Sequence, residues 1–142
     1  MEKTFYTNNF NQTINLGKEI AKAIKSGTII TLHGNLGAGK TTFVQGLAKG
    51  LGIKKRVVSP TFVLVRSYIL DGGRKFHHID LYRIELKKDI KKLGIAELFE
   101  DKNNIIAIEW PEKINNLPKK RIDVFFEYLS DTKREIRVKN YE

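Results

Sequence analysis

Residues 34–41 carry side chains and a spacing that fit the binding of a polyphosphate. They read Gly-Asn-Leu-Gly-Ala-Gly-Lys-Thr and match the P-loop pattern G-x-x-x-x-G-K-[ST] at every fixed position. Glycines let the backbone approach phosphates closely, with its N–H groups pointing inward. Lys40 can reach the β- and γ-phosphates, and Thr41 can offer its hydroxyl to Mg²⁺. The pattern predicts a site for a polyphosphate and Mg²⁺ that includes Asn35, Leu36, Gly37, Ala38, Gly39, Lys40, Thr41 and Thr42.

The segments on either side of this loop have the order that a phosphate loop needs. Residues 28–33 are short, β-branched and mostly apolar, which predicts a buried strand. After the loop, apolar residues recur at helical spacing, and glycines at 50 and 52 stand where the helix would end. The dipole and free N–H groups at the start of that helix would face the phosphates. A Gly-rich turn that binds nothing is the alternative, and the complete motif in this context favours phosphate binding.

Two acidic residues at predicted strand ends are the candidates for the metal site and for catalysis. The apolar run 105–108 predicts a buried strand, and Glu109 follows it directly, where Walker B acids occur. Asp80 ends another predicted strand. Ligands of open α/β sheets bind beyond the carboxyl ends of the strands, so both carboxylates are expected near the phosphates. Glu109 has the better Walker B context, and the division of roles between the two acids stays open; a surface glutamate is the alternative.

Hydroxyl and imidazole groups give weaker signals. Thr61 follows Pro60 in a loop and could contact the γ-phosphate or Mg²⁺, although an ordinary Ser-Pro turn is the alternative. The adjacent His77 and His78 invite a zinc interpretation, but zinc would need further His or Cys ligands, and the chain has only His33 besides and no cysteine. His78 is therefore predicted to orient a neighbour or to pack.

Composition predicts one globular domain over residues 1–142. The chain is 41% hydrophobic and 30% charged, which suits a soluble protein large enough to bury a core. Without cysteine it has no disulfide framework and no thiolate chemistry. No apolar run approaches membrane-spanning length and no signal peptide is evident, so we expect no membrane partner and a cytoplasmic location.

The charge of the chain is strongly positive. Lys and Arg number 26 against 16 Asp and Glu, for a formal net charge of +10. The basic residues cluster at 54–56, 87–92, 119–121 and 133–139. Such a field attracts nucleic acid or acidic partners, whereas a solvated surface is the alternative. No RNA-binding signature accompanies the charge, so direct contact with RNA stays open.

Other elements follow from periodicity and turn signals. Asn11 or Thr13 can cap a first helix that continues to about Lys25. Residues 62–70 and 74–80 predict a hairpin closed by Asp-Gly-Gly, and residues 121–128 and 134–141 predict a second one. Residues 84–101 predict a charged helix, broken at a glycine.

Four blocks, in this order, resemble the bacterial TsaE family, the small ATPase of tRNA threonylcarbamoyladenosine synthesis. They are the loop 34–42, Ser-Pro-Thr-Phe at 59–62, His-Ile-Asp-Leu-Tyr-Arg at 78–83 and Glu-Trp-Pro at 109–111. The combination is specific, whereas the loop alone is generic. One departure is Asn35, where the family often has an acidic residue.

The resemblance implies an α/β, P-loop NTPase-like three-layer fold, with a mostly parallel central sheet and added antiparallel hairpins. It implies Mg-ATP binding, slow hydrolysis, and docking onto the TsaB–TsaD synthase, which the ATPase would reset between turnovers. By resemblance Lys40 and Thr41 contact phosphate and Mg²⁺, Asp80 and Glu109 are the acids of the site, and Thr61 senses the γ-phosphate. An arginine finger could come from Arg83 or from a partner. Contact with tRNA would be direct, through basic patches, or indirect.

Two other classes of protein share parts of this pattern. A small-molecule kinase has the same loop but needs an acceptor pocket and usually an Arg-rich lid, and the Lys-rich stretch after residue 84 is short for a lid. A non-enzymatic RNA-binding module would bind RNA in a salt-sensitive way, regardless of nucleotide. Phosphate release without an acceptor distinguishes the ATPase from the kinase.

Overall fold

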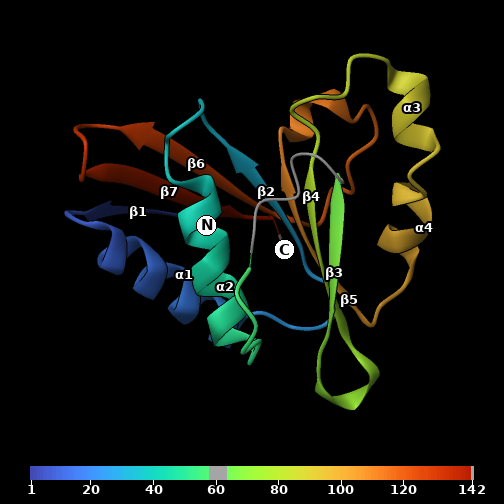
Figure 1. Cartoon of the computed structure of the whole chain (residues 1–142), viewed down its shortest axis with the longest axis horizontal. Coiled ribbons are helices and arrows are strands. Elements are labelled where there is room, and N and C mark those ends of the chain that lie inside the picture. Colours follow the sequence, from blue (N-terminus) through green and yellow to red (C-terminus); the bar gives the residue numbers. More distant parts are fainter. Residues whose placement is uncertain (58–63, 142) are drawn as a thin grey trace.

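The computed structural model describes residues 1–57 and 64–141, and one seven-stranded sheet forms the centre of that part of the chain. The strands lie in the order β1-β7-β6-β2-β5-β4-β3 (Figure 1). Their bounds are β1 Glu2–Thr7, β2 Ile29–His33, β3 Val65–Ile69, β4 Lys75–Asp80, β5 Asn104–Glu109, β6 Ile122–Tyr128 and β7 Arg134–Asn140. The helices are α1 Phe10–Ala23, α2 Lys40–Gly50, α3 Lys87–Lys91 and α4 Ile95–Glu100, with short 3₁₀ helices η1 Asp71–Gly73 and η2 Pro111–Lys113.

Four neighbouring strands, β6, β2, β5 and β4, run parallel at the centre of the sheet, and antiparallel strands complete both sides. Strand β5 is buried along its whole length, as expected for a central parallel strand with both faces covered. The carboxyl ends of these strands meet at one edge of the sheet. In the observed register Glu109 lies beside Leu32 of β2 and Asp80 of β4.

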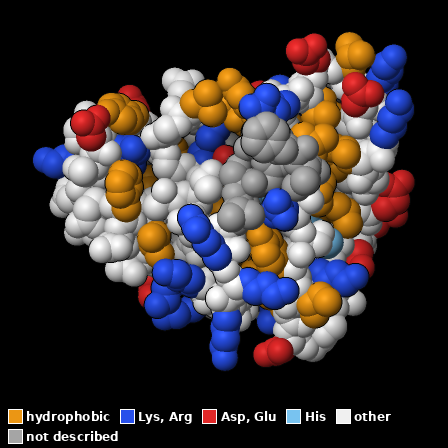
Figure 2. All heavy atoms as spheres, viewed as in Figure 1, with side chains coloured by type: hydrophobic (Ala, Val, Ile, Leu, Met, Phe, Trp, Pro, Cys, Tyr) orange, Lys and Arg blue, Asp and Glu red, His pale blue; other side chains and the backbone are white. Residues whose placement is uncertain are grey.

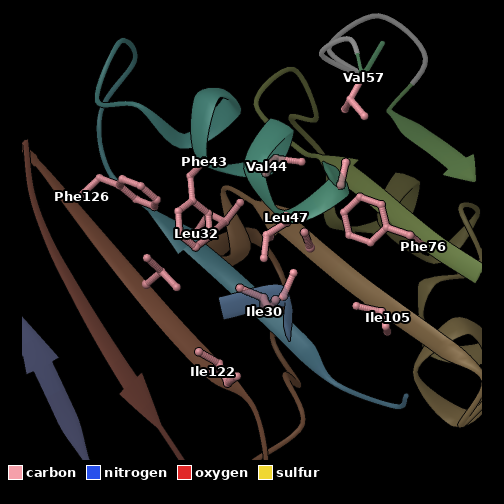
Figure 3. Packing of buried hydrophobic residues seen from close by; sticks show 14 of the residues in the cluster. Ile30, Leu32, Phe43, Val44, Leu47, Val57, Phe76, Ile105, Ile122 and Phe126 are labelled. Carbon is pink, nitrogen blue, oxygen red and sulfur yellow. The ribbon is translucent and has the colours of Figure 1, made fainter. Parts of the chain in front are cut away.

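Helices cover both faces of the sheet, so the structure has three layers (Figure 1). Successive residues of β2 face opposite sides: Ile30 and Leu32 join the apolar cluster with α1 and α2, while Ile29 joins the cluster with α3 and α4. Figure 2 shows many Lys and Arg side chains on the outer surface around α2. Beneath that surface, Phe43 and Leu47 of α2 pack onto the sheet (Figure 3).

The helices α1 and α2 touch backbone to backbone. A Cβ added at Gly46 would lie 2.1 Å from the carbonyl oxygen of Ile14, and one at Gly17 would lie 2.4 Å from that of Phe43. Such distances are closer than any methyl group tolerates, so glycine is required for the contact. The contact holds α2 on α1 and thereby fixes the helix that begins at the end of the Gly-rich loop 34–39.

Most elements expected from the sequence are confirmed, including the strand and helix that flank the loop and both hairpins. The expected cap at Asn11 or Thr13 is wrong, because α1 begins at Phe10 and the side chain of Asn9 accepts from the amide of Gln12. The break expected at Gly94 within residues 84–101 is confirmed, because two short helices lie on either side of this residue, whose φ of 69° is left-handed. Within the described ranges, no helix has the length and apolarity to cross a bilayer.

Replacing Gly46 with Ala tests the contact between α1 and α2. In a helix interior this change normally stabilises by about 0.5–1 kcal/mol. Here the methyl group would meet the Ile14 carbonyl, and overpacking of this kind costs about 1–3 kcal/mol. We expect a lower free energy of unfolding in urea for Gly46→Ala, and a nearly unchanged one for the neighbouring control Gln45→Ala. A Gly46→Ala protein more stable than the wild type would contradict the close packing.

Candidate functional site

A pocket of about 340 Å³ opens where the loop after β2 meets the ends of β4 and β5. Eight of the predicted site residues line it: Leu36, Gly37, Gly39, Lys40, Thr41, Thr42, Asp80 and Glu109. Of the other predicted residues, Ala38 is buried in the core, Asn35 is exposed, and Thr61 lies outside the described residues. The lining is completed by Phe10, Trp110 and Arg134.

The loop between β2 and α2 holds a backbone shape that favours glycine. Gly37 has a φ of 80° and Gly39 a φ of 103°, both left-handed, which costs other residues roughly 1–2 kcal/mol. Gly39 is also the N-cap of α2, and no side chain in the described part of the chain caps this helix. The first amides of α2, at Lys40, Thr41 and Thr42, therefore stand at the pocket wall together with the positive end of the helix dipole. This arrangement favours an anion.

Lys40 is buried at the pocket, with 5% of its surface exposed. Its ammonium donates to the carbonyl oxygen of Gly34 at 2.6 Å and lies 4.0 Å from the ring centre of Trp110. Burial lowers the pKa of Lys40, and the charges of Glu109 and Asp80 oppose that shift. A charge removed from water in this way interacts more strongly with an anion than a solvated lysine does.

Trp110 supports Lys40 from a strained position. Its backbone φ is 61°, in the left-handed region that bulky residues rarely adopt. The indole also packs against the ring of Tyr82, with 5.1 Å between ring centres. The sharp turn directly after Glu109 thus places the indole beside the lysine that the loop supplies.

The two predicted acids lie side by side, as register partners at the ends of β4 and β5. Both are nearly buried, Asp80 at 5% and Glu109 at 4% exposure. Asp80 accepts a hydrogen bond from the amide of Tyr82 at 3.0 Å, and Glu109 accepts one from Nε2 of His78 at 2.6 Å. Each carboxylate is therefore held in one orientation by a donor on β4 or just after it.

His78 is fully buried, and the sequence-based prediction that it orients a neighbour agrees with its contact to Glu109. Among the residues that the structure describes, no group is placed to hydrogen-bond its Nδ1. The contact with the Glu109 carboxylate needs a proton on Nε2, because a carboxylate oxygen only accepts. The ring then serves as a fixed donor to the glutamate.

Arg134, at the start of β7, is a site residue that the sequence analysis missed. Its buried guanidinium donates to the carbonyl oxygens of Ala38 and Gly37, each at 3.0 Å, and so ties the loop to the far side of the sheet. The sequence did contain a signal for this role. Arg134 alternates with Ile136 and Val138, which places a charged residue at an inward position of the strand.

The pocket contains the oxygen donors that Mg²⁺ prefers, namely the Thr41 hydroxyl and the carboxylates of Asp80 and Glu109. Among the described residues, no group of three or more His, Cys, Asp or Glu side chains is placed to hold a metal ion. Mg²⁺ usually binds through one or two carboxylates together with water and substrate phosphates. The donor set of this pocket fits that mode.

Comparison with known proteins identifies the relatives of the chain. The family model for "Threonylcarbamoyl adenosine biosynthesis protein TsaE" matches residues 7–136. The chain belongs to the TsaE family. A tRNA threonylcarbamoyladenosine biosynthesis protein TsaE from Aquifex aeolicus is 41% identical over 130 residues, or 89% of this chain and 87% of the relative. The TsaE protein of Bacillus subtilis is 39% identical over 131 residues, or 92% and 80% of the two chains.

A solved structure agrees with this assignment. The crystal structure of Bacillus subtilis YdiB matches the present structure with a TM-score of 0.83 and 33% sequence identity, over 100% of this chain and 87% of the other. The family match begins at the end of β1 and ends within β7, so it includes the loop, both acids and Arg134. The resemblance to the TsaE family that the sequence carries is confirmed.

Substitutions of His78 test how Glu109 is held. His78→Phe keeps the ring but leaves the buried carboxylate without its donor, and we expect a loss of about 1–3 kcal/mol in the free energy of unfolding. His78→Gln can replace the Nε2 donor and should recover part of that loss. His78→Asn, one methylene shorter, should not. Urea denaturation measures the free energy of unfolding of the three variants. Equal values for the Phe and Gln variants would contradict the contact between His78 and Glu109.

Proposed function

We propose that this chain binds Mg-ATP and hydrolyses it in tRNA threonylcarbamoyladenosine biosynthesis. The observation that carries the proposal is the convergence of Lys40, Asp80 and Glu109 on one pocket beside a complete P-loop motif. The names of the family and of its members support the pathway. The fold, in this proposal, is that of a P-loop NTPase, with the nucleotide phosphates at the amino end of α2.

The loop and Lys40 bind the phosphates in this proposal. The first amides of α2 supply donors that face an anion. Arg134 donates hydrogen bonds to the carbonyl oxygens of Gly37 and Ala38, which keeps these oxygens turned away from the phosphates. The Lys40 ammonium is already desolvated beside Trp110. Phe10 and Leu36 are exposed apolar side chains of the pocket lining and offer a surface for the adenine base.

Thr41, Glu109 and Asp80 are the residues that would hold Mg²⁺, whose charge neutralises the phosphate oxygens when it is bound. Glu109 is our choice for the principal contact, because it lines the pocket and His78 holds its carboxylate in one orientation. Asp80 either joins it or orients the attacking water. Thr61, which lies outside the described residues, remains the proposed γ-phosphate sensor.

Hydrolysis by the isolated chain is expected to be slow, because its pocket arginine is committed to the loop. The guanidinium of Arg134 already donates to Gly37 and Ala38, and Arg83 is an exposed residue outside the pocket lining. We propose that the TsaB–TsaD synthase completes the site and that hydrolysis resets this synthase between turnovers. A cytoplasmic location belongs to the same proposal.

Trp110, the single tryptophan of the chain, provides the test. Because the indole contacts Lys40 and lines the pocket, its emission should change saturably as Mg-ADP or Mg-ATP is added. Lys40→Ala removes a charge-assisted contact worth about 1.5–3 kcal/mol, so nucleotide affinity should fall at least about tenfold. Glu109→Gln should reduce the change in emission.

The control for this titration is Lys49→Ala, which removes a lysine from the other end of the same helix and should leave the affinity unchanged. Calorimetry on the same samples measures nucleotide binding independently of fluorescence. A flat emission titration under conditions where calorimetry detects bound nucleotide would place Trp110 away from the phosphates. Undiminished affinity in Lys40→Ala would refute the phosphate site itself.

A further inference from the structure

Basic side chains collect at the edge of the sheet opposite the nucleotide pocket. Helix α2 has 11 residues, and at roughly 1.5 Å per residue it carries the chain about 16 Å away from that pocket. Helix α1 ends at the same place, since a Cβ at Gly50 would lie 2.5 Å from the Cβ of Ala21. The positive charge found there is therefore too distant to serve the phosphates of a nucleotide bound at Lys40.

Two hollows mark this edge. One, of about 650 Å³, lies beside the end of α2 and is lined by Gln45, Ala48, Lys49, Ile53, Lys54, Lys55, Arg56 and Val57. The other, also of about 650 Å³, lies at the starts of β2 and β6, and its lining includes Lys25, Lys102, Lys120 and Arg121. The described residues of the two linings include no aspartate or glutamate. Figure 2 shows blue side chains gathered over the lower part of α2 and the loop that follows it.

We call the exposed lysines and the arginine of these hollows the basic edge: Lys25, Lys49, Lys54, Lys55, Arg56, Lys102 and Lys120. Within residues 1–57 and 64–141, the ion pairs of the structure include none of them. The acid nearest in sequence, Asp101, accepts a hydrogen bond from the amide of Asn103. Cations gathered without counter-charges repel one another, and a polyanion would relieve that repulsion.

The surroundings of the basic edge distinguish between kinds of polyanion. None of the exposed large apolar side chains of the described residues belongs to either hollow. A protein partner needs aromatic or aliphatic anchors at the centre of an interface, and single-stranded RNA needs aromatic platforms for its bases. The exposed residues of the two linings are mostly lysine and arginine, and a surface of this kind fits the phosphate backbone of a folded RNA.

We propose that the basic edge binds the phosphate backbone of a folded RNA, independently of the nucleotide pocket. We take this folded RNA to be a transfer RNA, and that choice rests on the proposed function in tRNA modification. Nucleotide and RNA would then occupy opposite ends of α2. Binding through phosphates alone is insensitive to sequence and weakens steeply with salt.

The test uses two triple variants of the full-length chain with equal changes in net charge. Lys54→Glu, Lys55→Glu and Arg56→Glu reverse charge at the basic edge, whereas Lys88→Glu, Lys91→Glu and Lys92→Glu reverse it on exposed positions at α3, on the other face of the sheet. The probe is a fluorescently labelled, unmodified tRNA transcript, and its anisotropy is followed over about 50–200 mM salt.

The basic-edge variant should bind this tRNA at least about tenfold more weakly, with the slope of log affinity against log salt reduced by about 2 to 3. The α3 variant should stay within about threefold of the wild type, because charges more than about 10 Å away are screened. Equal loss in both variants, or no binding by the wild type, would overturn the proposal. Unchanged tRNA binding combined with lost association with TsaB–TsaD would assign the edge to a protein and overturn it too.

The Trp110 titration with Mg-ADP separates this proposal from the proposed function. Both triple variants should give the wild-type emission change, because neither alters the pocket, and that result also shows that the variants are folded. If the wild type gave no nucleotide signal but bound tRNA through the basic edge, the ATPase proposal would fail and the RNA surface would stand. If nucleotide bound normally and the two variants bound tRNA alike, the RNA surface alone would fail.

Discussion

The parallel pairing of β2, β5 and β4 is the constraint on which the site depends. It brings the Gly-rich loop after β2, Glu109 and Asp80 to the same edge of the sheet, although these residues come from separate parts of the chain. A slip of one residue in the pairing of β4 and β5 would turn Asp80 to the opposite face, away from α2. The buried apolar residues of β5 prevent such a slip, because alternate side chains pack into the two different clusters.

Burial of the charged groups in this site costs free energy, and it also fixes their orientation. Lys40, Asp80 and Glu109 are each about 95% buried, and an uncompensated charge at that depth costs several kcal/mol. Each has a partner that is already fixed: the Gly34 carbonyl, the Tyr82 amide and the His78 ring. The Lys40 ammonium also attracts the carboxylates of Glu109 and Asp80 across the pocket. A site oriented in advance needs little reorganisation when a ligand arrives, which is the basis of electrostatic catalysis.

The sequence predicted the parts of the site that lie in continuous motifs. The loop, its flanking strand and helix, and Glu109 after an apolar run were all predictable, because each depends on neighbours along the chain. The role of Arg134 was not predictable from the sequence, because its contact with the loop joins residues 96 positions apart. The donor that His78 supplies to Glu109 depends on strand register, which periodicity alone does not give. The α1–α2 contact is likewise set by tertiary packing at Gly46 and is invisible in local pattern.

The most direct test of the central claim is Mg-dependent phosphate release from ATP by the chain together with TsaB and TsaD. Asp80→Asn and Glu109→Gln keep size but remove charge, and Asp71→Asn, at an exposed turn, serves as the matched control. If these acids serve the reaction at the phosphate loop, the two site variants lose turnover by about 100-fold or more while they still fold and bind nucleotide. Normal turnover in both site variants would contradict the account.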